Sequence, residues 1–517
     1  MIPLHITHMQ PKALMIEEIT TGPDAASMDF SRASILCLGD VMLDRFAYCA
    51  IERISPEAPV PVLLVQERRS SLGGAGNVAR NIAALGGSAV LIGLRGRDAD
   101  GEAVAAMIRS TPRLVDALIA SESRPTTAKT RYIAGHQQVF RVDDELAHTL
   151  DAAEEAALLG AIDKAIQTVD AVVISDYGKG VATRAIVSST IRGARSRRVP
   201  VFVDPKRDTF RHYRGATCIT PNLAELARAA KLPAATDAEV VAAATQVLRE
   251  AEAEAILTTR SEKGMLLVEA SGAVHVERAR AREVFDVSGA GDTVIAALAL
   301  AHAGGHALPD AMRLANTAAG IVVGKLGTAT VELDELVLEL SREAREHDVG
   351  RAKLYSVAEA ETLARQWQSR GLSVGFTNGC FDIVHPGHVT LLSKARRECD
   401  RLIVALNSDA SVSRLKGPQR PVNALDDRAA VIGALASVDA VISFDEDTPI
   451  TLITRLKPDV LIKGADYTIA TVVGAEEVLA AGGRVALIDL VDGYSTTRTI
   501  GRMSGEIPRT VAIASDG

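Results

Sequence analysis

Short apolar runs alternate with longer stretches whose apolar residues recur at helical spacing. The runs lie at 34–40, 171–174, 200–204 and 255–259, and the helical stretches include 152–169, 237–251 and 290–303. Strands that alternate with helices are typical of a mostly parallel sheet covered by helices. The pattern therefore predicts an α/β fold for this part of the chain.

Two segments interrupt this pattern. A Val-rich segment at 60–65 lies between Pro59 and a charged stretch, and it predicts a strand that leaves the main sheet, such as part of a small β lid. Residues 1–32 show weak periodicity and turn-prone residues, so we expect a flexible N-terminal extension there.

The alternation starts again after a charged stretch at 332–353, which predicts a terminal helix followed by a linker. Expected strands lie at 373–377, 401–406, 440–444, 459–463 and 485–488, with helices beginning near 387, 426 and 448. This indicates a second, Rossmann-like α/β domain. We expect a first domain at 33–338, a linker with a connecting helix at 339–371, and a second domain at 372–517.

The amino-acid composition narrows the range of possible functions. The 57 Lys and Arg against 65 Asp and Glu give a net charge of −8, and aromatic residues make up 3%. Both values disfavour nucleic-acid binding. No apolar run approaches the roughly 18–20 residues that span a bilayer. We therefore expect no membrane partner. Five widely spaced cysteines without a CxxC pair favour a reducing, cytoplasmic compartment.

The first candidate site is a glycine-rich turn before a predicted helix. Gly289, Ala290 and Gly291 precede Asp292 there. The free amides at a helix start bind anions, and a carboxylate beside them can accept a proton from a hydroxyl. The turn therefore suits phosphoryl transfer. The alternative is an ordinary Asp cap on a glycine-rich turn.

Other segments of the first domain point the same way. A second glycine-rich loop contains Gly73, Gly74 and Asn77, and Asp40 and Asp176 each follow a predicted strand. Carboxylates at strand ends line the usual ligand crevice of α/β sheets. No Walker A motif is present, which disfavours a P-loop kinase.

Asn222 and Glu225 begin a predicted helix, and taken singly they are an N-cap and its capping-box partner. Together with the two glycine-rich segments, they resemble the ribokinase-like family of carbohydrate kinases over about 34–331. The resemblance implies phosphorylation of a sugar hydroxyl by ATP, with Asp292 as the base. It also assigns phosphate stabilisation to Gly289, Ala290 and Gly291, ATP binding to Asn222, Leu223, Ala224 and Glu225, indirect Mg²⁺ binding to Glu225, and sugar binding to Asp40, Gly73, Gly74, Asn77 and Asp176.

The second candidate site is the motif that ends in His385, Pro386, Gly387 and His388, between a predicted strand and helix. Two imidazoles three positions apart at a helix start can stabilise the charge of one phosphate. Metal ligation is the alternative, but the motif lacks the Glu of a zincin helix.

Further along, Lys416 and Lys463 are candidate phosphate cations, although each in isolation reads as a solvated surface lysine. A hydroxyl-rich run follows at Ser495, Thr496 and Thr497, which can cap a helix or bind phosphate.

This half resembles the cytidylyltransferase-like nucleotidyltransferases over about 374–500, with HxGH and STT motifs. The resemblance implies transfer of a nucleoside monophosphate with release of pyrophosphate, but does not choose between ATP and CTP. Besides His385 and His388 as catalytic residues, it assigns nucleotide binding to Phe381, Asp382, Lys416, Ser495, Thr496 and Thr497.

The order of the two domains resembles the bifunctional heptose-phosphate kinase/adenylyltransferase family. Ala465 stands where that family usually has a second Gly, and the extension before Ser34 is longer than expected. The resemblance implies ATP as co-substrate of both reactions, Mg²⁺, heptose phosphates as substrates and a homodimer. Within it, Arg141 is a candidate for binding the 7-phosphate, on charge alone. The alternatives are another sugar kinase fused to a CTP-using cytidylyltransferase, and a nucleotide-sensing regulator without turnover.

Overall fold

The computed structural model describes residues 16–18, 28–135, 137–146, 149–279, 286–325, 327–346 and 353–489. The chain forms two compact units, Met1–Leu336 and Val337–Gly517, and each is described by itself. Among the described helices, none has the length and apolar character needed to cross a membrane.

The first unit is built on a ten-stranded sheet in the order β1-β16-β15-β14-β13-β12-β11-β2-β5-β7. Its strands are β1 (Ile16–Glu18), β2 (Ser34–Gly39), β5 (Ser88–Ile92), β7 (Leu114–Asp116), β11 (Ala171–Ser175), β12 (Val201–Asp204), β13 (Cys218–Ile219), β14 (Ala255–Thr259), β15 (Met265–Glu269) and β16 (Val274–Glu277). All pairings from β14 to β7 are parallel, whereas β15 runs antiparallel to both neighbours. The predicted, mostly parallel α/β sheet is confirmed. Within the expected N-terminal extension, β1 pairs with β16.

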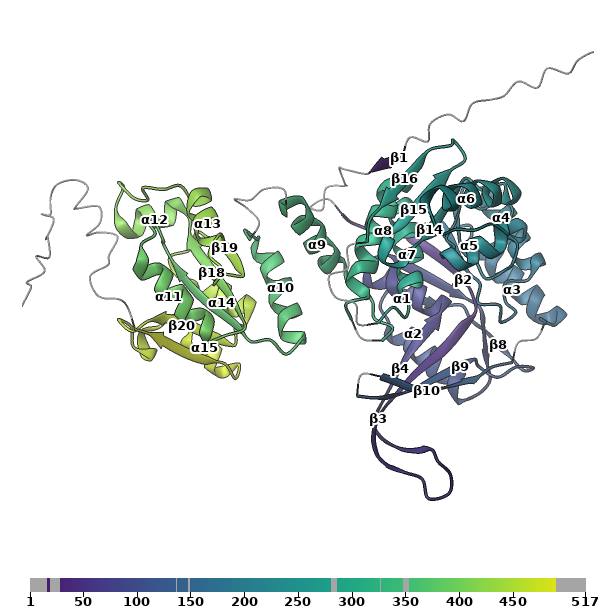
Figure 1. Ribbon diagram of the computed structural model, residues 1–517, viewed down its shortest axis with the longest axis horizontal. Helices are drawn as coiled ribbons and strands as arrows, with labels where there is room; N and C mark the ends of the chain where they lie inside the picture. The colour runs from purple at the N-terminus through teal and green to yellow at the C-terminus, as the bar shows by residue number, and fades with distance from the viewer. Residues whose placement is uncertain are drawn as a thin grey trace, which may run out of the picture. The chain divides into compact units, whose positions relative to one another are not determined.

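Helices cover both faces of this sheet (Figure 1). They are α1 (Ala75–Ala84), α2 (Ala99–Ser110), α3 (Ala152–Ala165), α4 (Arg184–Ser196), α5 (Leu223–Ala230), α6 (Asp237–Ala251), α7 (Ala290–Ala303) and α8 (Leu308–Val322), while α9 (Leu333–Glu346) spans the boundary between the two units. One buried apolar cluster joins the sheet to α3, α4, α5 and α6. On the other face, α7 packs between α1 and α8 and lies against β11 and β12. The carboxyl ends of these central strands therefore lie beside the start of α7.

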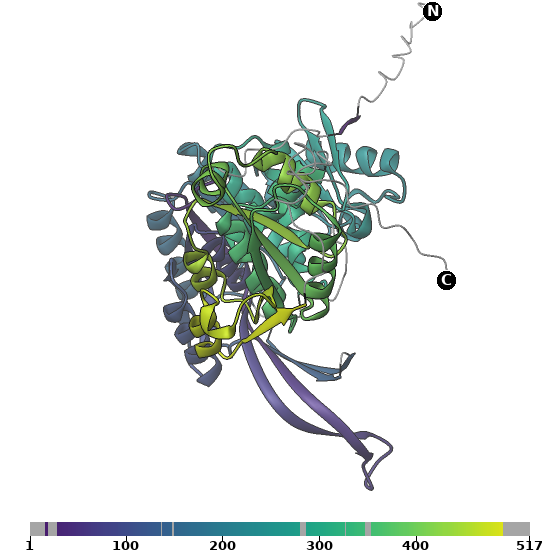
Figure 2. The same ribbon diagram turned by 90° about the vertical axis from the view of Figure 1, so that its left-hand side faces the viewer.

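A separate four-stranded sheet has the order β10-β9-β3-β4, and we call it the lid sheet. Its strands are β3 (Val41–Ile54), β4 (Pro61–Gly74), β9 (Ala128–Ala134) and β10 (Gln137–Asp144); β6 (Leu94–Gly96) and β8 (Ile119–Ser121) pair separately. Figure 2 shows the β3–β4 hairpin extending from its unit. The lid strand predicted at 60–65 is confirmed, but the observed strand is longer than the predicted one. β4 continues through the polar residues 66–71, which are largely exposed, so apolar alternation does not mark them.

The second unit contains a parallel sheet in the order β19-β18-β17-β20-β21. Its elements are α10 (Val357–Ser369), β17 (Val374–Gly379), α11 (Pro386–Arg397), β18 (Arg401–Asn407), α12 (Asp409–Lys416), α13 (Leu425–Gly433), β19 (Ala440–Phe444), α14 (Ile450–Leu456), β20 (Val460–Gly464), α15 (Ala475–Ala480) and β21 (Arg484–Ile488). Apolar clusters cover both faces, as predicted for a Rossmann-like domain. The strand order reverses between β17 and β20, and ligands of such sheets bind at that point, beyond the carboxyl ends.

Candidate active sites

Asp292 lies in the first turn of α7, only 4% exposed, with hydrogen-bond donors at both carboxylate oxygens. Asn77 Nδ2 donates to one oxygen at 2.8 Å, and the Tyr177 hydroxyl donates to the other at 2.9 Å. Burial raises the pKa of Asp292 to about 6, against the effect of these two hydrogen bonds. The group is therefore mostly ionised near pH 7 and able to accept a proton.

Gly289 provides the turn that starts α7. Its φ of 82° lies in the left-handed region, and a Cβ there would come within 2.8 Å of Asn77 Nδ2. The Ala290 amide donates to the Val287 carbonyl at 3.2 Å, so this predicted phosphate donor is used within the turn. Gly291 lines a cavity, and the first amides of a helix lack intrahelical acceptors. The turn therefore suits an anion at Gly291.

That cavity has a volume of about 200 Å³ at the carboxyl edge of the main sheet. Besides Gly291, its polar lining includes Asp176, Asp204, Lys206, Asn222 and Glu225. Burial, with the charges of Asp292 and Glu225, raises the pKa of Asp204 well above its ordinary value. A cation in the cavity would offset this accumulation of negative charge.

Asn222 and Glu225 form a capping box at the start of α5, so the structural interpretation of this pair holds. The Asn222 side chain accepts from the Glu225 amide at 2.9 Å, and Glu225 accepts from the Asn222 amide at 3.1 Å. Both also line the cavity, and Lys206 Nζ lies 3.7 Å from Glu225. Leu223 and Ala224 occupy the first turn of α5 outside the cavity lining.

The two predicted strand-end carboxylates are engaged by the protein itself. Asp40 accepts backbone hydrogen bonds from Tyr177, Lys179 and Val181 at 2.9–3.1 Å. Asp176 accepts from Tyr213, Arg207 and the Gly178 amide, and its side chain is buried. These contacts fix the 176–181 turn, which carries Tyr177.

The glycine-rich loop before α1 packs against Asp44, a residue that motif comparison does not single out. A Cβ on Gly73 would come within 2.2 Å of Asp44 Oδ2, and one on Gly74 would come within 2.3 Å of the Asp40 carbonyl oxygen. Asp44 is 4% exposed and accepts a hydrogen bond from Arg131 on β9 at 2.5 Å. The loop is therefore glycine-rich because neighbouring oxygens approach its backbone.

Arg141 lies on β10 with an exposed side chain that pairs with Asp143 at 2.8 Å. It therefore has a carboxylate partner already.

The sequence analysis missed Tyr177. Its one sequence signal is the Asp-Tyr-Gly-Lys-Gly run that follows a strand.

In the second unit, the two histidines of the HxGH motif meet at the start of α11. His385 is the N-cap residue, Pro386 follows at the first helical position, and the His385 and His388 rings stack with centroids 3.8 Å apart. Burial lowers the pKa of His388 to about 4, assisted by His385, and burial also lowers the pKa of His385. A bound polyphosphate would favour their protonated forms and be stabilised in return.

The turn between β17 and His385 is constrained. Phe381 has a φ of 44°, unusual for a residue with a side chain, and its ring lies 5.0 Å from that of His388. A Cβ on Gly379 would approach that ring within 2.9 Å. The chain thus holds an unfavourable backbone conformation that places Phe381 against the histidine pair.

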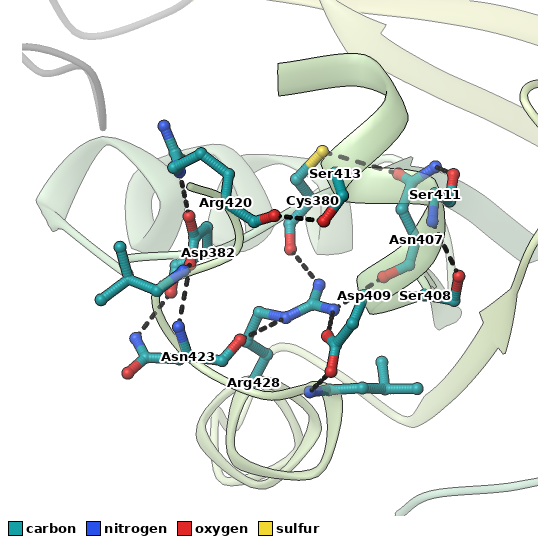
Figure 3. Close-up of polar contacts among 12 residues, drawn as sticks. Cys380, Asp382, Asn407, Ser408, Asp409, Ser411, Ser413, Arg420, Asn423 and Arg428 are labelled. Atoms are coloured by element: carbon teal, nitrogen blue, oxygen red, sulfur yellow. Dashed lines mark hydrogen bonds and ion pairs between the residues drawn. The ribbon is translucent and has the colours of Figure 1, made fainter. Parts of the chain in front are cut away.

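A buried Arg428 ties this turn to the neighbouring strand end (Figure 3). Its guanidinium donates to the carbonyls of Cys380, Asn407 and Asn423 at 2.5–3.1 Å and to Asp409 at 2.7 Å. Since the Arg428 side chain is fully buried, these acceptors replace its hydration.

Asp382 is engaged in the same region. It accepts hydrogen bonds from Arg420 and from the amides of Val422 and Asn423, the latter two at 2.7 and 3.1 Å (Figure 3). Asp382 is 2% exposed, so these contacts shape the loop.

The two candidate lysines differ in environment. Lys416 is exposed at the end of α12. Burial raises the pKa of the Cys380 thiol, in the turn before the HxGH motif, and the charge of Lys416 opposes this rise. Lys463, the residue before the last one of β20, is partly buried and donates to Asn378 at 2.5 Å, and burial lowers its pKa to about 8. The predicted Ser495, Thr496 and Thr497 lie outside the described residues.

Comparison with known families agrees with both units. The pfkB family carbohydrate kinase model matches residues 32–335, and the cytidylyltransferase-like model matches residues 376–496. Two solved structures cover the first unit: Escherichia coli phosphofructokinase-2 in complex with potassium (21% identity, TM-score 0.51, 60% of this chain and 99% of that one) and a putative ribokinase from Agrobacterium tumefaciens (21%, 0.50, 61% and 99%). At this identity they establish the fold alone. The fold and sites thus define a carbohydrate kinase joined to a nucleotidyltransferase.

Relatives that match nearly the whole chain show which family of two-domain enzymes it belongs to. Bifunctional protein HldE of Gluconacetobacter diazotrophicus is 58% identical over 92% of this chain and 98% of the relative. The protein of the same name from Rhodospirillum rubrum is 51% identical over 92% and 95%. The chain therefore belongs to the bifunctional HldE family.

The Tyr177 hydrogen bond predicts a pH effect. Tyr177→Phe removes a donor that lowers the pKa of Asp292, so this pKa rises above about 6. If Asp292 is the base of the kinase reaction, the reaction requires its ionised form, so the rise of kinase rate with pH shifts to higher pH. A pH profile of ADP formation measures this shift, with Tyr132→Phe on the lid sheet as control. An unchanged profile contradicts the role of Tyr177.

The Arg428 contacts predict a loss of stability. Arg428→Met leaves the carbonyls of Cys380, Asn407 and Asn423 without this donor, and the hydrogen bond to Asn407 is fully buried, so the free energy of unfolding of the second unit falls by about 3 kcal/mol. Trp367, the single tryptophan, packs against the core of this unit and reports its denaturant unfolding by fluorescence. The exposed Arg397→Met is the matched control, and equal stability of the two variants contradicts the prediction.

Proposed function

We propose that the first unit phosphorylates D-glycero-β-D-manno-heptose 7-phosphate at C1 with ATP. The second unit transfers AMP from ATP to D-glycero-β-D-manno-heptose 1-phosphate, which gives ADP-heptose and pyrophosphate. The observation that carries the kinase assignment is Asp292, held by two donors beside an anion-binding helix start. Membership of the HldE family supports the pairing of the two activities.

In the kinase reaction, the oxygen of the sugar hydroxyl attacks the γ-phosphorus of ATP, and ADP leaves. Asp292 accepts the proton of this hydroxyl. Tyr177 and Asn77 hold the carboxylate in position, and the α7 start stabilises negative charge on the transferring group. Gly73 and Gly74 let the loop pack against Asp44 and Asp40, which fixes it beside the sugar site. Asp40 and Asp176 keep the 176–181 turn in place.

We infer that this cavity takes a magnesium ion that is held mainly through ATP phosphates and water, because no group of three or more acidic, His or Cys side chains converges on a metal site within the described residues. The carboxylate and amide oxygens of its lining are the ligand type that Mg²⁺ prefers, and a cation there would favour the ionised form of the buried Asp204. Glu225 would hold the ion through water, together with ATP phosphates. When bound, Mg²⁺ neutralises phosphate charge.

In the adenylyl transfer, the sugar phosphate attacks the α-phosphorus of ATP and pyrophosphate leaves. His385 and His388 stabilise the charge that develops on the α-phosphate. Lys416, Thr496 and Thr497 assist, with Phe381, Asp382 and Ser495 at the nucleotide site.

The two reactions are not consecutive, because a separate phosphatase must remove the 7-phosphate between them. Fusion of the two domains then keeps the two activities in equal amounts. It does not require that an intermediate pass directly from one site to the other. The proposal includes a homodimer in the cytoplasm that acts on small molecules and binds neither nucleic acid nor membrane. The free state of all five cysteines supports a reducing compartment.

Two substitutions separate the reactions. Asp292→Asn removes the base, so ADP formation from heptose 7-phosphate falls by about 10³-fold or more, while adenylyl transfer is unchanged. His388→Ala removes a charge-stabilising group, so pyrophosphate release falls by about 10²-fold while kinase activity remains. Each variant serves as the folding control for the other.

ATP and CTP are compared side by side in the pyrophosphate assay with heptose 1-phosphate. We expect turnover with ATP. Faster turnover with CTP would contradict the adenylyl assignment, and absence of both ADP and pyrophosphate from pure protein would favour a regulatory role.

A further inference from the structure

Two polar side chains lie beside each other where the strand order of the second unit reverses. Asn378 and Lys463 are the residues before the last ones of β17 and β20, and each follows a residue of the paired Phe376 and Leu461 by two positions. Phe376 and Leu461 belong to one apolar cluster, so Asn378 and Lys463 project from the same face of the sheet. Both residues therefore lie at the carboxyl edge, where ligands of such sheets bind.

The ammonium of Lys463 has donors left for a ligand. A lysine ammonium carries three N–H groups. Among the residues that the structure describes, its one hydrogen-bond acceptor is Asn378 Oδ1, at 2.5 Å, and it lies 5.6 Å from the centre of the Tyr467 ring. Burial lowers the pKa of Lys463, and the charge of the exposed Asp466 opposes this shift without an ion pair between the two groups.

The strand that carries Asn378 also leads to the HxGH motif. After β17 the chain turns to His385 and His388 at the start of α11, which packs in the apolar cluster on one face of the sheet. After β20 it leads to α15, which packs in the cluster on the other face. Loops that leave neighbouring strands toward opposite faces border the usual ligand crevice of such a sheet. We therefore expect Lys463 and the two histidines to border one ligand site.

Adenylyl transfer brings two anions together at such a site. A phosphate monoester carries a charge of about −1.5 to −2 near pH 7, and the α-phosphate of ATP is also negative. Repulsion between these charges opposes the approach of the attacking oxygen, and it is strongest where water is excluded. In the proposed reaction, His385 and His388 stabilise the α-phosphate, so the attacking phosphate needs a separate cation. A lysine ammonium is a compact charge that binds phosphate well.

We propose that Lys463 binds the phosphate of the sugar 1-phosphate and holds it for attack on the α-phosphorus of ATP. This inference rests on the proposed function and identifies a residue that selects a phosphorylated acceptor. In the step, an oxygen of the acceptor phosphate bonds to the α-phosphorus, and the bond from that phosphorus to the oxygen of the leaving pyrophosphate breaks. Lys463 keeps its proton throughout. The phosphates of ATP are the other possible partner of the ammonium, and the test distinguishes the two.

The test uses Lys463→Met and Lys463→Gln in the full-length protein. The Gln variant keeps a donor for Asn378 but removes the charge. Pyrophosphate release is measured while heptose 1-phosphate and ATP are varied in turn. Since a charge-assisted hydrogen bond to phosphate is lost, we expect KM for heptose 1-phosphate to rise about tenfold or more in both variants, with KM for ATP unchanged.

Lys353→Met is the matched control. Lys353 is a partly buried lysine of the same unit, and its ammonium donates to the carbonyls of Leu435 and Val438 at 3.0 and 2.7 Å. These carbonyls precede β19 and therefore lie at the amino edge of the sheet, opposite the ligand edge. We expect wild-type KM values for both substrates in this variant.

An unchanged KM for heptose 1-phosphate in Lys463→Met overturns the proposal. A rise confined to KM for ATP also overturns it and assigns the lysine to the nucleotide. Wild-type behaviour of Lys463→Gln would show that the bond to Asn378 matters and the charge does not, and an equal rise in Lys353→Met would trace the effect to lost stability. Either result contradicts the proposed role.

A binding measurement keeps this inference separate from the proposed function. Heptose 1-phosphate is titrated calorimetrically into the protein together with an ATP analogue that has a methylene group between the α- and β-phosphorus atoms and cannot release pyrophosphate. If the wild type forms no pyrophosphate from ATP, the proposed adenylyl transfer fails, yet weaker binding by Lys463→Met than by the wild type and Lys353→Met still supports the acceptor site. Equal binding by all three proteins, or binding by none, refutes it.

Discussion

The kinase unit depends on one carboxylate held by donors from two separate elements. Asn77 belongs to α1, which follows the lid strand β4, and Tyr177 belongs to the turn after β11 in the main sheet. Any shift of either element relative to α7 removes a donor from Asp292 and alters its charge state. The buried carboxylate thereby links the lid sheet, the main sheet and the start of α7.

The surrounding contacts support this arrangement. Asp40 holds the backbone of the Tyr177 turn through three amides, and Asp44 holds the backbone of the glycine-rich loop at close range. The second unit uses the same principle with different residues. There, Arg428 joins the turn after β17 to the end of β18, and His385 and His388 stack at the start of α11. In both units, polar contacts from neighbouring loops fix the start of a helix that carries candidate catalytic residues.

The sequence predicts the elements better than the contacts. The expected helices at 237–251 and 290–303 coincide with α6 and α7, because caps and apolar spacing are local signals. Tyr177 is 115 residues from Asp292, and Asn77 is 215 residues from it, so no local pattern reveals their contact. Charge alone selects Arg141, and the sequence does not reveal that its exposed side chain already pairs with Asp143. The place of Asp40 and Asp176 after predicted strands correctly predicts that they lie at the edge of the sheet. It does not reveal that their oxygens accept hydrogen bonds from the protein's own donors.

Phosphorus NMR of the wild-type protein with heptose 7-phosphate, ATP and Mg²⁺ tests most directly whether the two-donor carboxylate directs phosphate to a sugar hydroxyl. The account predicts a new phosphomonoester resonance coupled to the anomeric proton, formed together with ADP while the 7-phosphate resonance persists. ADP accompanied only by inorganic phosphate, or a new phosphate on another carbon, would contradict it.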